Sequence, residues 1–149
     1  MMILSVILLL FSKPSANPDL VYLRSLFVSA AADESKAAQL IEETQDEQWN
    51  PVLKAYCGAG NILMANHFYN PLKKFDSFNE GKALLESAIV ADGQNPELRY
   101  LRLTIQYNAP AFLGYNKNIA MDKQYLEECL PKIEDQQLKT MIKQFLSSM

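Results

Sequence analysis

One eight-residue motif occurs twice in this chain and constrains its fold more than any other feature. Residues 17–24 read NPDLVYLR and residues 95–102 read NPELRYLR, so six positions are identical and a seventh exchanges Asp for Glu. A weaker copy, NPVLKAY, occupies residues 50–56. Asn is a preferred N-cap, Pro suits the first helical position, and an acidic residue favours the positive end of the helix dipole. The motif therefore predicts three helices, which begin at residues 18, 51 and 96.

A second amphipathic segment follows each of these helix starts. Apolar residues recur at spacings of i, i+3, i+4 and i+7, and the strict alternation typical of strands occurs nowhere in the chain. We expect three helical pairs: 18–31 with 34–44, 51–69 with 78–91, and 96–107 with 122–130. The predicted fold class is therefore all-α, built from stacked antiparallel helical hairpins.

The C-terminal segment carries an apolar stripe on an otherwise polar helix. The stripe consists of Leu138, Met141, Ile142, Phe145 and Leu146. Gln and Lys side chains fill the opposite face. Stacks of helical repeats need a terminal helix with a polar outer face, so this segment is predicted to cap the stack. An ordinary amphipathic surface helix would show the same pattern.

Residues 55–97 are similar to one unit of the tetratricopeptide repeat family, which places aromatic and small residues where its two helices touch. The matching positions are Tyr56, Ala59 and Gly60 in the first helix and Gly81, Leu85 and Ala88 in the second. Close approach of the helices would explain Gly60 and Gly81, because a side chain would not fit there. The resemblance implies a right-handed superhelix of about three pairs plus the C-terminal capping helix. It also implies a concave face that binds peptides or protein partners, and no catalytic residues.

The N-terminal run from residue 3 to residue 11, ILSVILLLF, has the length of the apolar part of a signal peptide. It is too short to cross a bilayer, which needs about 20 apolar residues. Pro14, Ser15 and Ala16 follow, and we expect cleavage after Ala16. This predicts a signal peptide over 1–16, a single domain over 17–149, a periplasmic or secreted location, and no membrane span after cleavage. The alternative is a cytoplasmic protein in which residues 3–11 form a buried helix.

Composition excludes several classes of partner and fold. The chain has 149 residues, of which 49% are apolar and 21% are charged, as in ordinary globular proteins. Its formal net charge of −3 leaves no electrostatic footprint for a nucleic acid. We therefore expect no nucleic-acid partner, and the protein or peptide partner is what the resemblance to tetratricopeptide repeats implies.

The reactive residues do not form a recognisable catalytic or metal-binding set. His67 is the only histidine, and Cys57 lies ten residues earlier on the same predicted helix, about 80° away around its axis. No metal-ligand spacing and no phosphate-binding glycine loop is present. We therefore expect no enzymatic activity, no cofactor and no metal. Cys57 and Cys129 fit apolar core stripes, and in an oxidising compartment they could also pair with each other.

Two segments rich in aromatic residues, 66–78 and 107–119, are predicted to be loops at the same end of the stack. Their Asn-Pro, Ala-Pro and Gly content is typical of loops, and Tyr and Asn suit partner contact. The candidate binding residues are Phe68, Tyr69, Arg99, Arg102, Tyr107, Phe112, Tyr115 and Asn116. The leading hypothesis is a peptide- or protein-binding scaffold that exposes Tyr, Asn and Arg on its concave face.

Two alternatives stay open at this point. The first is a pocket for a small molecule or glycan between the two aromatic segments, lined by Phe68, Phe112 and Tyr115. The second is that both segments fold back and bury their aromatic residues in the core.

Overall fold

The computed structural model describes residues 19–149. The predicted signal peptide, its cleavage after Ala16 and the first Asn-Pro dipeptide lie outside these residues. The described chain forms seven α-helices and three short 3-10 turns and has no strand between residues 19 and 149. The all-α class predicted from the sequence is therefore confirmed.

The elements follow one another along the chain with short connections. The helices are α1 (Leu20–Ala30), α2 (Glu34–Thr44), α3 (Pro51–Met64), α4 (Pro71–Ala91), α5 (Pro96–Asn108), α6 (Ile119–Cys129) and α7 (Gln136–Ser148). The 3-10 turns are η1 (Ala65–His67), η2 (Ala111–Leu113) and η3 (Leu130–Lys132).

Two of the three predicted Asn-Pro starts are confirmed, and the first helix begins two residues later than predicted. The side chain of Asn50 accepts hydrogen bonds from the backbone amides of Val52 and Leu53, and α3 begins at Pro51. Asn95 accepts from the amide of Glu97, and α5 begins at Pro96. In the first copy of the motif, the acidic residue Asp19 is the N-cap of α1 and accepts from the amide of Tyr22.

A fourth Asn-Pro start makes α4 longer than the helix predicted over 78–91. Asn70 accepts hydrogen bonds from the amides of Leu72 and Lys73, and the helix begins at Pro71. The prediction of a loop over 66–78 was therefore wrong for most of its length. Asn70 and Pro71 cap the helix in the same way as the other copies. The sequence motif was missed here because Leu and Tyr do not occur at the positions where the other copies have them.

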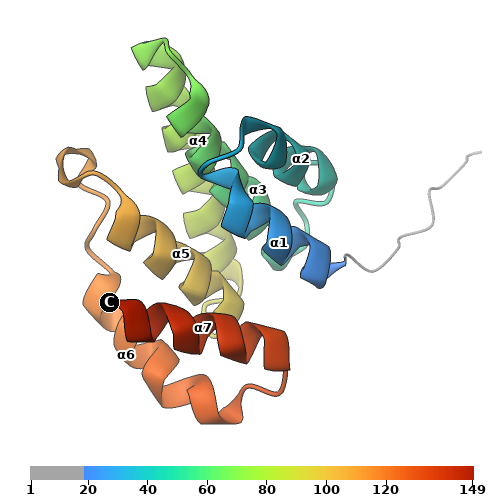
Figure 1. The fold of residues 1–149 in the computed structure, drawn as a ribbon, viewed down its shortest axis with the longest axis vertical. Coiled ribbons are helices and arrows are strands. Elements are labelled where there is room, and N and C mark those ends of the chain that lie inside the picture. The colour runs from blue at the N-terminus through green and yellow to red at the C-terminus, as the bar shows by residue number, and fades with distance from the viewer. Residues whose placement is uncertain (1–18) are drawn as a thin grey trace, which may run out of the picture.

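The helices pack as neighbours along the chain and also as a row of alternate helices. Figure 1 shows α3 and α4 in the middle of the molecule, with α1 and α2 on one side and α5, α6 and α7 on the other. Each helix contacts the next, while α1 contacts α3, α3 contacts α5, and α5 contacts α7. The apolar stripe of the last helix faces inward, because Leu138 and Ile142 are buried in the core that all the helices share.

A buried ion pair joins the helices of this row. Glu97 on α5 accepts two hydrogen bonds from Arg24 on α1, at 2.8 and 2.9 Å, and one from the hydroxyl of Tyr56 on α3, at 2.5 Å. Arg24 also donates to Gln137 and pairs with Asp135 beside α7. Burial and the charge of Glu97 raise the pKa of Tyr56 above its usual range, so the tyrosine stays a neutral donor.

Two glycines allow α3 and α4 to approach closely. A Cβ atom on Gly58 would lie 2.6 Å from the carbonyl oxygen of Gly81, and a Cβ on Gly81 would overlap the carbonyl oxygen of Gly58. Gly60 faces α2 instead, where a Cβ would lie 2.9 Å from Cγ1 of Ile41. Gly60 and Gly81, which were expected where helices touch, both lie at such contacts. Gly58 lies opposite Gly81 at the contact between α3 and α4, which is the closer one.

We predict that Gly81→Ala lowers the free energy of unfolding by about 1–3 kcal/mol, because the new methyl group meets backbone atoms that cannot give way. Ala is favoured over Gly inside a helix by about 1 kcal/mol, so any loss of stability comes from the contact. Urea unfolding followed by circular dichroism measures the change. Ser87→Ala, at an exposed position of the same helix, is the control. An unchanged or higher stability of Gly81→Ala would refute the close approach.

Candidate binding groove

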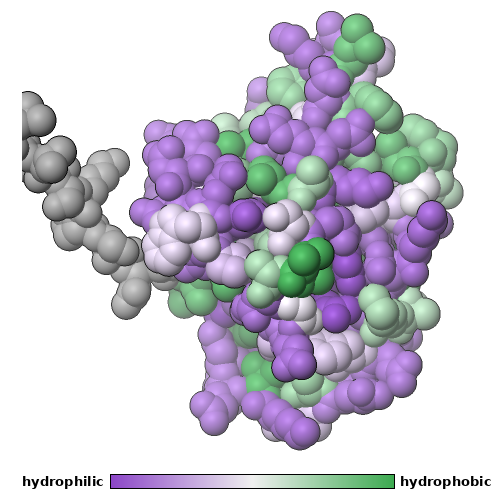
Figure 2. All heavy atoms as spheres, turned by 180° about the vertical axis from the view of Figure 1, so that it is seen from behind, coloured by the Kyte–Doolittle hydropathy of each residue, from purple (hydrophilic) through white to green (hydrophobic). Residues whose placement is uncertain are grey.

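An apolar groove of about 810 Å³ lies at the end of the molecule where α4 begins and α5 ends. Its walls come from α1, α3, α4, α5 and α7 and from the η2 turn. Figure 2 shows that the face of the molecule seen from behind is mostly hydrophilic, with apolar residues scattered over it. The groove lies between the two segments that the sequence marked by their aromatic residues.

The floor of the groove is buried and its rim is exposed. Phe27, Phe78 and Tyr100 line it and are 5–6% exposed, as members of the hydrophobic core. Phe75 and Phe112 also line it, but they are 57% and 87% exposed. A cluster of large apolar side chains at a protein surface marks an interaction site more often than a single exposed apolar residue does. This groove is therefore the candidate functional site.

Local backbone chemistry holds Phe112 at the rim. Pro110 favours an extended backbone for Ala109, which ends α5 there. The η2 turn follows and ends at Gly114, whose φ of 65° is the only positive value among the described residues. Because this left-handed conformation costs Gly nothing, the turn closes tightly and leaves Phe112 pointing away from the core.

The structure brings few of the predicted site residues to the groove. Phe112 lines it, and Tyr107 stands at its edge, 44% exposed and edge-to-face with the ring of Phe145, which also lines it. Tyr69 is 99% exposed and does not line the groove. Asn116 is exposed in the loop after η2.

A pocket that Phe68, Phe112 and Tyr115 line together is not present in the structure. Phe68 lines a second hollow of about 710 Å³, between α2, α3 and α4. Tyr115 is 5% exposed and packs edge-to-face on Phe78. Tyr115 thus follows the alternative in which the aromatic residues fold back into the core, whereas Phe112 does not.

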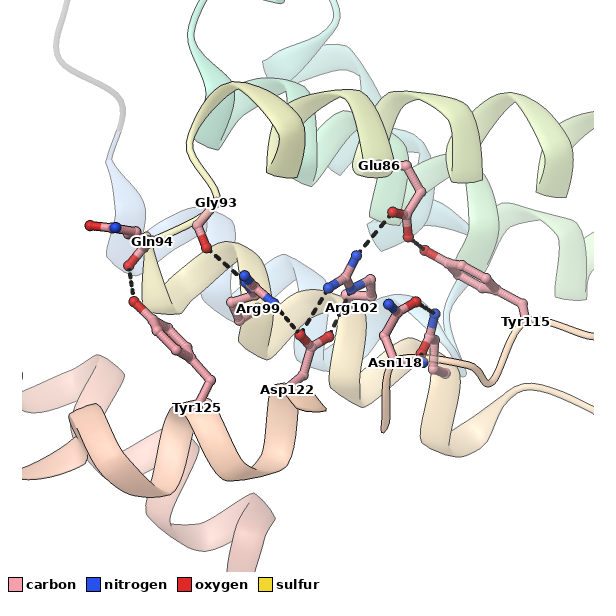
Figure 3. A network of polar contacts seen from close by, with 10 residues as sticks. Glu86, Gly93, Gln94, Arg99, Arg102, Tyr115, Asn118, Asp122 and Tyr125 are labelled. Carbon is pink, nitrogen blue, oxygen red and sulfur yellow. Dashed lines mark hydrogen bonds and ion pairs between the residues drawn. The ribbon is translucent and has the colours of Figure 1, made fainter. Parts of the chain in front are cut away.

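The predicted site residues Arg99 and Arg102 belong to a polar network between α4, α5 and α6, shown in Figure 3. Arg102 donates two hydrogen bonds to Asp122, at 2.7 and 2.9 Å, and one to Glu86, at 2.9 Å. Arg99 donates to the same Asp122 at 2.8 Å. The hydroxyl of Tyr115 donates to Glu86 at 2.6 Å.

This network buries Arg102 and leaves Arg99 half-buried. Arg102 is 4% exposed, and the side chain of Arg99 is 18% exposed. Burial alone would lower the pKa of Arg102, but the hydrogen bonds and charges of Asp122 and Glu86 outweigh it and raise that pKa. The expected exposure of these arginines on a binding face is therefore wrong, because carboxylates from neighbouring helices pair with them.

Several groove residues were not singled out by the sequence pattern as binding residues. Among them are Phe75 and Phe78, which lie three positions apart on α4 and therefore share one face of that helix. The signal that would have found them is Asn70-Pro71, since a helix start there fixes their relative direction. Phe27 and Phe145 had no such signal, because only tertiary packing brings α1 and α7 to this place.

The reactive side chains sit in structural roles. Cys57 is 2% exposed, and burial raises the pKa of its thiol. His67 lies with Nε2 2.9 Å from the carbonyl oxygen of Ala30, to which it donates. Both Cys57 and Cys129 are free thiols in the structure. Among residues 19–149, no three His, Cys, Asp or Glu side chains gather in a way that could hold a metal ion.

Comparison of the chain with models of protein families, with curated proteins and with solved structures found no match. Within the described chain, no helix combines the length and the apolar character needed to cross a membrane.

We predict that Asp122→Asn lowers the free energy of unfolding by about 3–5 kcal/mol, because it leaves the buried charge of Arg102 without its main partner. Glu127→Gln is the matched control, since it removes a carboxylate at an exposed position of the same helix. Urea unfolding of both variants measures the difference. Equal stabilities would show that the network contributes nothing to holding α6 against α5.

Proposed function

We propose that the protein is a non-enzymatic helical-repeat scaffold that binds a protein or peptide partner in the apolar groove. The observation that supports this most is the exposure of Phe75 and Phe112 at the rim of a groove whose floor is part of the core. Such side chains lose contact with water only when a partner covers them. Among residues 19–149, Lys74 is the only charged side chain that lines the groove, so the described lining offers no pair of titratable groups for general acid–base catalysis.

The arrangement of the groove also supports the resemblance to tetratricopeptide repeats. We propose that α1 with α2, α3 with α4, and α5 with α6 are the pairs of a right-handed superhelix, and that α7 caps it. The first helix of each pair and α7 contribute to the groove, as does α4 from the second helices. Stacks of this kind bind their partners on an extended concave surface.

A small apolar molecule is the second candidate for the same groove. Its volume of about 810 Å³ falls within the range of about 300–1,000 Å³ that ligand pockets have. The exposed rim favours a larger partner, since a small ligand would leave Phe112 in water. A glycan is disfavoured, because few hydrogen-bonding side chains line the groove.

A photo-crosslinking experiment tests the proposed partner binding. Benzoylphenylalanine replaces Phe112 at the rim, or Val90, which is 88% exposed on α4 outside the groove. Irradiation in the native cells should give protein adducts from position 112 and none from position 90. Identical adducts from both positions, or adducts from neither, would contradict a partner site at the groove.

We also propose export, with residues 1–16 as a cleaved signal peptide and a periplasmic or secreted mature protein. The support is the apolar run 3–11 followed by small residues. Mass spectrometry of the native protein should then find Asn17 as the first residue. A native chain that still carries residues 3–11 would favour the cytoplasmic alternative.

A further inference from the structure

The segments that line the groove contain no acidic residue. Residues 27–31, 62–66, 71–75 and 100–113 include neither Asp nor Glu, although the whole chain has 17 acidic residues against 14 basic ones. Asp76 directly follows the stretch 71–75, but its side chain lines the second hollow and not the groove. The groove is therefore apolar with a positive rim on a protein of net negative charge.

The second hollow has the opposite charge. Four carboxylates line it, those of Glu34, Glu42, Asp76 and Glu80, against the one ammonium group of Lys73. The neighbouring residue Lys74 lines the apolar groove, is exposed, and has no carboxylate within ion-pair distance among residues 19–149. The two sides of the first turns of α4 thus offer different charges, and of the two hollows the groove is the one that suits an anionic group.

The lining of the groove also restricts the backbone of an occupant. Its polar side chains are few, and two of them are already engaged within α5: Thr104 donates to the carbonyl of Tyr100, and Asn108 donates to the carbonyl of Thr104. An extended peptide would bury amide and carbonyl groups without partners, which is costly. Asn66, Lys74 and Tyr100 are the other polar side chains of the lining, too few to pair the backbone groups of an extended peptide. A helix satisfies these groups internally, so the lining favours a helix.

The length of the groove matches a short helical contact. Along α5 it runs from Tyr100 to Asn108, which is about 12 Å at a rise of 1.5 Å per residue. An occupant helix of slightly more than two turns spans that length. Its apolar residues would then stand at positions i, i+3, i+4 and i+7.

We propose that the groove binds the apolar face of a partner helix whose flanking residues are acidic, with one of these carboxylates paired to Lys74. This inference rests on the proposed partner-binding function and names the chemistry of the partner. Apolar anchors supply the affinity through the floor and rim of the groove. The absence of acidic residues in the walls, together with Lys74, selects the charge of the flanks.

Two synthetic helical peptides test the inference. Both carry Leu at i, i+3, i+4 and i+7; one has Glu beside this face, and its twin has Lys at the same positions. Fluorescence anisotropy with the purified protein at low salt should show the Glu peptide binding about tenfold more tightly than the Lys peptide, a difference of about 1.4 kcal/mol. Lys74→Glu should remove or reverse this preference.

Two variants locate the binding. Phe112→Ser should weaken binding of the Glu peptide at least several-fold, whereas Val90→Ser, at an equally exposed apolar position outside the groove, should leave it unchanged. Circular dichroism checks that each variant keeps its helical fold. Both substituted side chains are mostly in water, so neither change should disturb the core.

Three results would overturn the inference: equal affinity for the two peptides, a preference that survives Lys74→Glu, or no binding of either peptide. Binding to phosphatidylglycerol vesicles that depends on Phe112, without peptide binding, would assign the groove to lipid and also overturn it. The photo-crosslinking experiment tests the proposed partner binding separately from the peptide experiment. Protein adducts at position 112 combined with no charge preference would leave partner binding standing and reject only the acidic helix.

Discussion

The carboxylate of Glu97 is the contact on which the arrangement of the helices depends. It accepts hydrogen bonds from Arg24 and Tyr56, and Arg24 extends the link to Gln137 and Asp135. One buried acid on α5 therefore joins α1, α3 and the beginning of α7. A buried charge is tolerated only when its partners are complete, so this network restricts how the alternate helices lie against each other in a way that apolar packing alone does not.

The repeated motif supplies both capping and ion-pair chemistry. Arg24 and Arg102 occupy the last position of the two close copies. Both are buried, and each pairs with carboxylates from other helices: Arg24 with Glu97, and Arg102 with Asp122 and Glu86. The recurrence of Arg at one face of the first helix thus has a structural purpose. It also accounts for the burial of Arg102, which was one of the candidate binding residues.

The groove forms where the start of α4, the end of α5 and the η2 turn meet. The start of α4 and the η2 turn reach beyond the core, and Phe75 and Phe112 stand on them at the two sides of an apolar floor. On α4, Asp76 and Glu80 line the second hollow and Glu86 pairs with Arg102, so that Lys74 is the charged side chain of this helix at the groove. Burial of apolar area by a partner would stabilise the complex by about 25 cal/mol per Å² before the cost of association.

The amino-acid sequence alone predicts the helical class and the first residues of α2, α3 and α5, because N-capping by Asn or Asp and a first-turn Pro act within a few residues. It located the α3 and α5 starts at Pro51 and Pro96 and placed the apolar stripe of α7 correctly toward the core. It also marked the two aromatic segments between which the groove lies. These features depend on hydrogen bonds at the helix ends and on helical periodicity, both of which involve residues a few positions apart in the sequence.

Which of those residues are exposed depends on how the helices pack against one another. Tyr115 and Arg102 became buried, while Phe112 stayed exposed, although all three lie in or near the same polar and aromatic region of the sequence. Tyr115 is buried against Glu86 and Phe78 of α4, and Arg102 is buried against Asp122 of α6. Exposure is set by contacts between segments far apart in the chain, and no local pattern records which side chain will meet its partner.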